Sequence, residues 1–149
     1  MINYLEYKID KFIFRVADDR YYTVDGLWVK PENNHIRIGI SDYLQQRSGD
    51  VAFVEVKPKG TQVAFNEELS VIETIKVNIS LASPVTGKVV EVNSILENSP
   101  ELINQDPYGT GWLAVLEPEK GEISKYRLLD PKTYFSKIKK DAEQELDKQ

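Results

Sequence analysis

The feature that most constrains the fold is an imperfect duplication in the middle of the chain. Residues 60–69 (Gly-Thr-Gln-Val-Ala-Phe-Asn-Glu-Glu-Leu) and residues 87–96 (Gly-Lys-Val-Val-Glu-Val-Asn-Ser-Ile-Leu) share glycine, valine, asparagine and leucine at the same four positions. Two copies are too few for a solenoid, which needs about three or more repeats. The pattern fits a duplicated β unit folded about a pseudo-twofold axis. Each copy is expected to form a strand, a turn and a second strand. The midpoint between the copies lies near Asn78, where we expect a tight, projecting turn.

The segments before the duplication also favour β-structure. Residues 36–40 alternate isoleucine with arginine and glycine, which is the period-two pattern of a half-buried strand. Residues 51–56 are rich in β-branched side chains and predict a second strand. Between these strands, Ser41 is placed to cap a short helix over residues 42–47, and Gly49 lies beyond its end.

The two ends of the chain differ from this β region. Asp130 followed by proline predicts a helix start, because a carboxylate caps the first turn and proline suits the first helical position. Apolar residues then recur at helical spacing, so residues 130–149 are expected to form an amphipathic helix docked on the β domain, frayed at 148–149. Residues 1–20 are expected to form an N-terminal extension packed on the domain, adding an edge strand. Residues 21–129 form the β domain in this prediction.

Length and composition exclude several classes of protein. A chain of 149 residues is the usual size of one domain. The net charge of -5 disfavours nucleic-acid binding, which needs a basic surface. The absence of cysteine excludes disulfides and thiolate chemistry. Apolar runs are too short for a membrane span, and the N-terminus does not resemble a secretory signal, so the expected location is cytoplasmic.

Lys76 is the strongest candidate for a functional residue. The sequence has one histidine, His35, and no evident Ser-His-Asp or metal-binding constellation. Lys76 lies near the expected turn between Ile75 and Val77, although exposed turns usually prefer Gly, Asn and Asp. A lysine amine at such a tip can be acylated, which removes its charge and gives a long arm. The simpler alternatives are that Lys76 is an ordinary solvated lysine and Glu73 an ordinary exposed charge.

Several stretches resemble a known family. Residues 70–76 (Ser-Val-Ile-Glu-Thr-Ile-Lys) resemble the Glu-Ser-Val-Lys-Ala lipoylation signature of glycine cleavage system H proteins. Residues 83–93 are similar to the family's Pro-Val-Ser-Gly-Glu-Val-Val-Glu-Val-Asn stretch, and residues 98–113 to its Asn-Pro-Glu-Leu-Val-Asn-x-Asp-Pro-Tyr-Gly-x-Gly-Trp segment. The resemblance extends over about residues 20 to 116. Residues 25–28 (Asp-Gly-Leu-Trp) stand where the family usually has His-Glu-Trp, and residues 77–81 are bulkier than usual.

The resemblance implies a mainly β fold, a flattened β-barrel of the lipoyl/biotinyl type (barrel-sandwich hybrid) with short helices and the C-terminal helix. It implies covalent lipoate on Lys76. Glu73, by its place three residues before Lys76, is a candidate contact for the modifying enzyme, a lipoate ligase or lipoyl/octanoyl transferase. The chain would be a carrier and not an enzyme. Its lipoyl arm would take an aminomethyl group from a pyridoxal-phosphate glycine decarboxylase to an aminomethyltransferase and be reoxidised by dihydrolipoyl dehydrogenase. A carrier that visits several enzymes favours a monomer.

Three alternatives stay open at this point. H-like lipoate-binding proteins carry sulfur intermediates for heterodisulfide-reductase-like sulfur-oxidation complexes, and other relatives relay lipoyl groups to other acceptors. Both alternatives keep the arm on Lys76 and change only its cargo. In the third, the chain is an unmodified interaction domain, and Lys76 has no special role.

Overall fold

A computed structural model describes residues 2–122 and 128–147, so the fraying expected at 148–149 lies outside the described residues. The fold is mainly β, as predicted. In chain order the elements are β1 (Tyr4–Ile9), β2 (Phe12–Ala17), β3 (Tyr21–Tyr22), β4 (Leu27–Glu32), β5 (His35–Ile40), α1 (Asp42–Ser48), β6 (Val51–Val56), β7 (Gln62–Val63), β8 (Glu68–Thr74), β9 (Asn78–Ala82), β10 (Gly87–Val92), the 3-10 helix η1 (Ser94–Glu97), α2 (Leu102–Gln105), β11 (Ala114–Pro118) and α4 (Pro131–Asp147).

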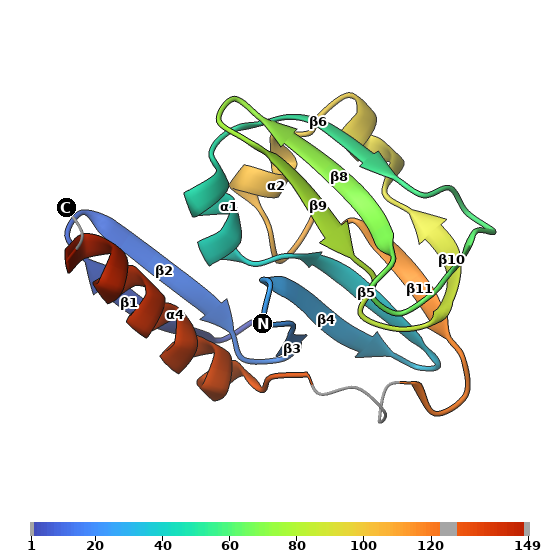
Figure 1. Ribbon diagram of the computed structural model, residues 1–149, viewed down its shortest axis with the longest axis horizontal. Helices are drawn as coiled ribbons and strands as arrows, with labels where there is room; N and C mark the ends of the chain where they lie inside the picture. Colours follow the sequence, from blue (N-terminus) through green and yellow to red (C-terminus); the bar gives the residue numbers. More distant parts are fainter. Residues whose placement is uncertain (1, 123–127, 148–149) are drawn as a thin grey trace.

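Two antiparallel sheets form the body of the molecule. One has six strands in the order β3-β4-β5-β11-β10-β7, and the other has three in the order β6-β8-β9 (Figure 1). The sheets do not close into one continuous ladder, so the body is a flattened barrel-sandwich, which confirms the predicted fold class. The barrel core between them consists of aliphatic residues: Leu27, Val29, Ile36, Ile38, Ile40, Val51, Val63, Leu69, Ile72, Leu81, Val85, Val89, Leu96, Ile103, Leu113, Ala114 and Leu116.

The predicted strand-helix-strand segment over residues 36–56 is confirmed. The isoleucines of β5 point into the barrel core, as their alternation with polar and small residues predicts. Ser41 caps α1 by accepting a hydrogen bond from the Leu44 backbone N–H at 3.2 Å. Gly49 follows the helix with φ 90°, a backbone conformation that residues other than glycine rarely adopt.

The duplication is only partly reflected in the fold. β7 and β10 pair antiparallel, with Gln62 opposite Lys88 and Val63 opposite Gly87, as a local twofold axis between the copies requires. The expectation of strand-turn-strand in both copies is wrong for the second one, which continues into η1. There the Asn93 side chain donates hydrogen bonds to two carbonyls of the loop before β11, each at 2.8 Å, and so ties the end of β10 to that loop.

The N-terminal extension does not add an edge strand to the larger sheets. Among the strands of the described residues, β1 and β2 pair only with each other, from Tyr4 opposite Ala17 to Ile9 opposite Phe12, and form a separate hairpin. α4 lies along this hairpin, to one side of the two sheets (Figure 1). Its predicted start is confirmed, because the Asp130 carboxylate accepts a hydrogen bond from the Thr133 N–H at 2.7 Å.

A second set of buried residues, the aromatic cluster, joins the hairpin and α4 to the body. It comprises Phe14, Val16, Ala17, Tyr22, Trp28, Tyr43, Tyr108, Tyr134, Ile138 and Ala142. Arg20 is buried at its centre, with its guanidinium 4.5 Å from the Trp28 ring and 5.3 Å from the Tyr108 ring. Burial raises the pKa of the neighbouring Asp19, but the hydrogen bond and charge of Arg20 outweigh burial and hold that pKa below its usual value.

Candidate functional site

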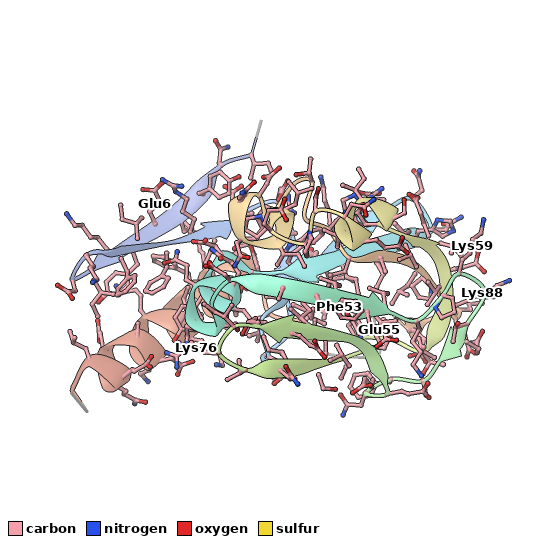
Figure 2. All side chains as sticks on the ribbon, turned by 90° about the horizontal axis from the view of Figure 1, so that it is seen from above. Glu6, Phe53, Glu55, Lys59, Lys76 and Lys88 are labelled. Carbon is pink, nitrogen blue, oxygen red and sulfur yellow. The ribbon has the colours of Figure 1, made fainter. Side chains whose placement is uncertain are left out.

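Lys76 lies on the exposed turn between β8 and β9. The turn comprises residues 75–77, slightly before the midpoint predicted near Asn78, which is instead the first residue of β9. Ile75 is 78% exposed and Val77 is 47% exposed, so two apolar side chains face solvent on either side of the lysine. Figure 2 shows Lys76 at the side of the two-sheet body that faces the β1–β2 hairpin and α4, and Lys59 and Lys88 at the opposite end of the body. The prediction of a projecting turn is confirmed.

The hydroxyl of Thr74 shapes this turn. Its oxygen accepts hydrogen bonds from the backbone N–H groups of Lys76, at 3.1 Å, and Val77, at 2.9 Å. The same hydroxyl donates to the Val77 carbonyl at 2.9 Å, which also accepts the Thr74 N–H at 2.9 Å. Thr74 was not predicted as a site residue; the tendency of threonine to bond nearby backbone groups was the available signal.

The Lys76 side chain lies against the end of α1. Its Nζ donates a hydrogen bond to the Arg47 carbonyl at 3.1 Å. A Cβ atom built on Gly49 would be 3.6 Å from Lys76 Cδ, so the lysine stem passes close to the helix end. A cation beside the last carbonyls of a helix is electrostatically favourable. The side chain is nevertheless exposed, so the amine remains accessible to another protein.

Glu73 lies on β8, three residues before Lys76. It is exposed, and its neighbours across the sheet are Phe53 on β6 and Asn78 on β9. Phe53 is 53% exposed (Figure 2). The structure therefore brings Glu73 and Lys76 to the same end of one hairpin, where an exposed aromatic side chain accompanies the carboxylate.

A cleft of about 290 Å³ lies beside the turn, and Lys76 is one of its lining residues. The other lining residues come from the β1–β2 hairpin, α1 and α4: Ile9, Asp10, Phe12, Phe14, Tyr43, Gln46, Arg47, Ala142, Glu145 and Leu146. An ion pair between Arg47 and Glu145 connects α1 to α4 at the cleft. The cleft was not predicted from the sequence, because its walls come from segments that only the folded chain brings together.

Other chemistry-bearing residues form no comparable site. His35 is half-exposed and its Nε2 lies 3.4 Å from a Glu117 carboxylate oxygen. Across residues 2–122 and 128–147, no three His, Cys, Asp or Glu side chains are grouped so as to hold a metal ion. The same described residues include no helix long and apolar enough to cross a membrane.

The fold and the turn together define a class of protein. Two facing β-sheets carry the turn between β8 and β9 at one end, and an exposed lysine stands at its tip beside a cleft. This arrangement is that of a lipoyl/biotinyl-type carrier domain, in which one lysine amine presents a covalently attached group to other proteins.

Comparison with known proteins identifies the family within this class. The glycine cleavage H-protein family model matches residues 20–141, so the chain belongs to the glycine cleavage H-protein family. The chain is 40% identical over 128 residues to a glycine cleavage system H protein of Thermus thermophilus, covering 85% of this chain and 98% of that protein. It is 44% identical over 104 residues to the glycine cleavage system H protein of Coprothermobacter proteolyticus, covering 69% of this chain and 82% of that protein.

A solved structure supports the same assignment. The crystal structure of a glycine cleavage system H protein from Mycobacterium marinum superposes with a TM-score of 0.74 at 31% identity, covering 81% of this chain and 97% of that chain. By family, the chain is a carrier protein and not a catalyst. The family model begins at residue 20, so the β1–β2 hairpin that walls the cleft lies outside the matched region.

Proposed function

We propose that Lys76 carries a covalent lipoyl group and that the chain shuttles the aminomethyl group of glycine between the enzymes of the glycine cleavage system. The observation that carries the proposal is the position of Lys76, exposed on a hydrogen-bonded turn and beside a cleft, in a chain of this family. The family normally carries lipoate, and the described residues fit that group. They offer a reachable amine with apolar neighbours, Ile75 and Val77.

Attachment needs only one reactive group from this chain. The unprotonated Lys76 Nζ attacks the carbonyl carbon of an activated lipoyl or octanoyl group held by the modifying enzyme. An amide bond forms, the bond between the acyl carbon and the activating group breaks, the activating group leaves with the electron pair of that bond, and one amine proton goes to solvent. The product no longer carries the lysine charge, so the electrostatic attraction between Nζ and the Arg47 carbonyl decreases and the arm is easier to release from α1.

The chain's own residues then hold and orient the arm. When bound, the lipoyl group supplies a dithiolane that accepts the aminomethyl group together with two electrons. The turn keeps the attachment point projecting, and the cleft lets an arm on Lys76 rest against Phe12 and Tyr43 without leaving the protein. The proposed partners are a pyridoxal-phosphate glycine decarboxylase, an aminomethyltransferase, dihydrolipoyl dehydrogenase and the lipoylating enzyme, and the proposed location is the cytoplasm.

Glycine exchange tests the proposed cargo. Lipoylated protein is mixed with the glycine decarboxylase, glycine and labelled bicarbonate, and label entering the glycine carboxyl group is measured. We expect exchange with the wild-type chain and none above background with Lys76→Arg, which keeps the charge but takes no lipoyl group. Absence of exchange with fully lipoylated wild-type protein would contradict the aminomethyl cargo while leaving the carrier role intact.

Sulfur cargo, the second candidate, is favoured by one observation. At the position where the family usually has the glutamate of His-Glu-Trp, this chain has Leu27, which is 2% exposed and belongs to the barrel core. The acidic side chain that the family usually has is therefore replaced here by an apolar one. Sulfur transfer to the lipoylated chain from a sulfur-oxidising complex, in the absence of glycine exchange, would favour this alternative.

Glu73 is proposed as a contact for the lipoylating enzyme. Its carboxylate is exposed, three residues from Lys76 on the same hairpin. We predict that Glu73→Ala slows lipoylation several-fold at limiting enzyme and leaves the melting temperature unchanged. Glu91→Ala, which removes an exposed strand carboxylate on β10, is the control. Equal lipoylation rates for Glu73→Ala and wild type would refute the role.

A further inference from the structure

The Thr74 hydroxyl has its full hydrogen-bonding capacity engaged by the lysine turn. A hydroxyl offers one donor and two acceptor sites. Here the donor goes to the Val77 carbonyl, and both acceptor sites receive backbone N–H groups, from Lys76 and Val77. One side chain therefore fixes the peptide on both sides of Lys76, at a turn whose other side chains face solvent.

The turn is also tied to the segment that follows α1. The Ile75 N–H donates to the Asp50 carbonyl at 3.1 Å. This contact joins the tip of β8–β9 to the corner formed by residues 49–51, next to which the Lys76 stem lies. The conformation of the turn thus depends on where that corner is held.

The Asn104 side chain on α2 holds the corner formed by residues 49–51. Its side-chain amide donates to the Gly49 carbonyl and to Gln45 Oε1, each at 3.0 Å, and its carbonyl accepts the Val51 N–H at 2.8 Å. These bonds clamp the residues on both sides of Asp50. A continuous set of hydrogen bonds therefore extends from α2 through the corner to the lysine turn.

We infer that Thr74 and Asn104 are positioning residues for the modification of Lys76, holding its turn in the conformation that the lipoylating enzyme binds. The inference rests on the proposed function. The enzyme must admit the lysine together with its flanking backbone, so a loosened turn is competent for only part of the time. The apparent affinity of the enzyme for the carrier then falls in proportion to the fraction of carrier molecules whose turn has the competent conformation, while the rate of the chemical step is unchanged.

The test measures lipoylation kinetics of the full chain with a lipoate–protein ligase, ATP and lipoate. We expect Thr74→Val to raise the KM for the carrier about 3- to 10-fold with kcat unchanged, and Thr74→Ser to restore the wild-type KM. Asn104→Ala is expected to raise KM in the same way by a smaller factor. Thr61→Val is the matched control, because the Thr61 hydroxyl donates a hydrogen bond to the Pro58 carbonyl in a different turn.

A second measurement separates positioning from general stability. Hydrogen exchange of the Lys76 and Val77 amides should be faster in Thr74→Val than in Thr74→Ser, while amides of the barrel core keep their wild-type protection. A wild-type KM in Thr74→Val, or a KM raised in Thr61→Val as much as in Thr74→Val, would overturn the inference. Wild-type protein that the ligase leaves unmodified would contradict the proposed function itself, a result distinct from the first.

Discussion

The barrel core and the aromatic cluster are two buried regions held together by different kinds of interaction. The barrel core is aliphatic, so its contribution is proportional to buried area and has little directional preference. The aromatic cluster contains buried tyrosine hydroxyls with specific partners: Tyr22 donates to the Ala17 carbonyl, Tyr108 to the Arg15 carbonyl, and the Tyr134 and Ser41 hydroxyls share a bond, each at 2.7 Å. Such bonds fix orientation as well as distance.

This difference explains how the lysine site is built. The barrel core supports the β8–β9 turn, because β8 is the central strand of its sheet and carries Ile72 into the core. The aromatic cluster orients the β1–β2 hairpin and α4, which supply most of the walls of the cleft beside Lys76. The first region therefore holds the attachment point, and the second shapes the surface that the attached arm meets.

The largest effect is expected from truncation in the barrel core. Ile72 is fully buried, and Ile72→Ala should lower the free energy of unfolding by about 2–5 kcal/mol, through lost burial and the cavity left behind. Urea denaturation followed by circular dichroism measures the loss. Ile95→Ala, at a side chain 57% exposed, is the control and should change it by less than about 0.5 kcal/mol. Equal losses in the two variants would contradict the assignment of the core.

A smaller effect is expected from removing the charge at the centre of the aromatic cluster. Arg20 Nη1 donates to the Tyr108 carbonyl at 3.0 Å, and Arg20→Met leaves that buried acceptor without its partner. We predict a loss of about 1–3 kcal/mol in unfolding free energy, with lipoylation of Lys76 unchanged at saturating ligase. Arg15→Met, which removes an exposed pair with Glu6, should cost about 1 kcal/mol or less. A lipoylation defect in Arg20→Met would show that the two regions are not separable.

The smallest effect at neutral pH is expected at Tyr134. Tyr134→Phe removes one hydroxyl bonded to Ser41 and should cost about 0.5–1.5 kcal/mol at pH 7 in urea denaturation. The comparison variant is Tyr21→Phe, because the Tyr21 side chain is 46% exposed. A loss in Tyr21→Phe as large as in Tyr134→Phe would contradict the role of the buried bond.

High pH should affect the aromatic cluster selectively. Burial raises the pKa of Tyr22, Tyr108 and Tyr134 above the ordinary value of 10.0, because it disfavours the charged phenolate. The stability linked to their neutral forms is fully present below the unfolded-state pKa and is lost as pH rises from there toward the folded pKa. Urea midpoints should therefore fall steeply above about pH 10, and less steeply in Tyr134→Phe. A midpoint independent of pH in that range would contradict burial of these hydroxyls.

The sequence predicted the parts of the fold that depend on local pattern. The isoleucine alternation of β5, the Ser41 cap of α1 and the Asp130 start of α4 are each determined by neighbouring residues, and each was confirmed. The exposed turn at Lys76 was also predictable, because the duplication and the family resemblance both indicated it. The second copy of the duplication was mispredicted, because Asn93 bonds a distant loop and periodicity carries no information about such contacts.

The parts that the sequence left unpredicted depend on long-range contacts. The hairpin was mistaken for an edge strand because the alternation in residues 12–17 gives no indication of its partner strand. The cleft needs residues from both ends of the chain and from α1, and no local pattern indicates that they meet. Asn104 lies in a segment that resembles the family closely, yet its bonds to Gly49 and Val51 are visible only in the folded chain.

The central claim is that Lys76 is the lipoylated residue, and intact mass of the protein purified from its native host tests it most directly. We expect wild-type protein to carry the mass of one lipoyl amide, peptide mapping to place it on Lys76, and Lys76→Arg to have the unmodified mass with an unchanged melting temperature. Unmodified wild-type protein from cells that lipoylate other proteins, or an adduct that persists in Lys76→Arg, would show that Lys76 is not the lipoylated residue.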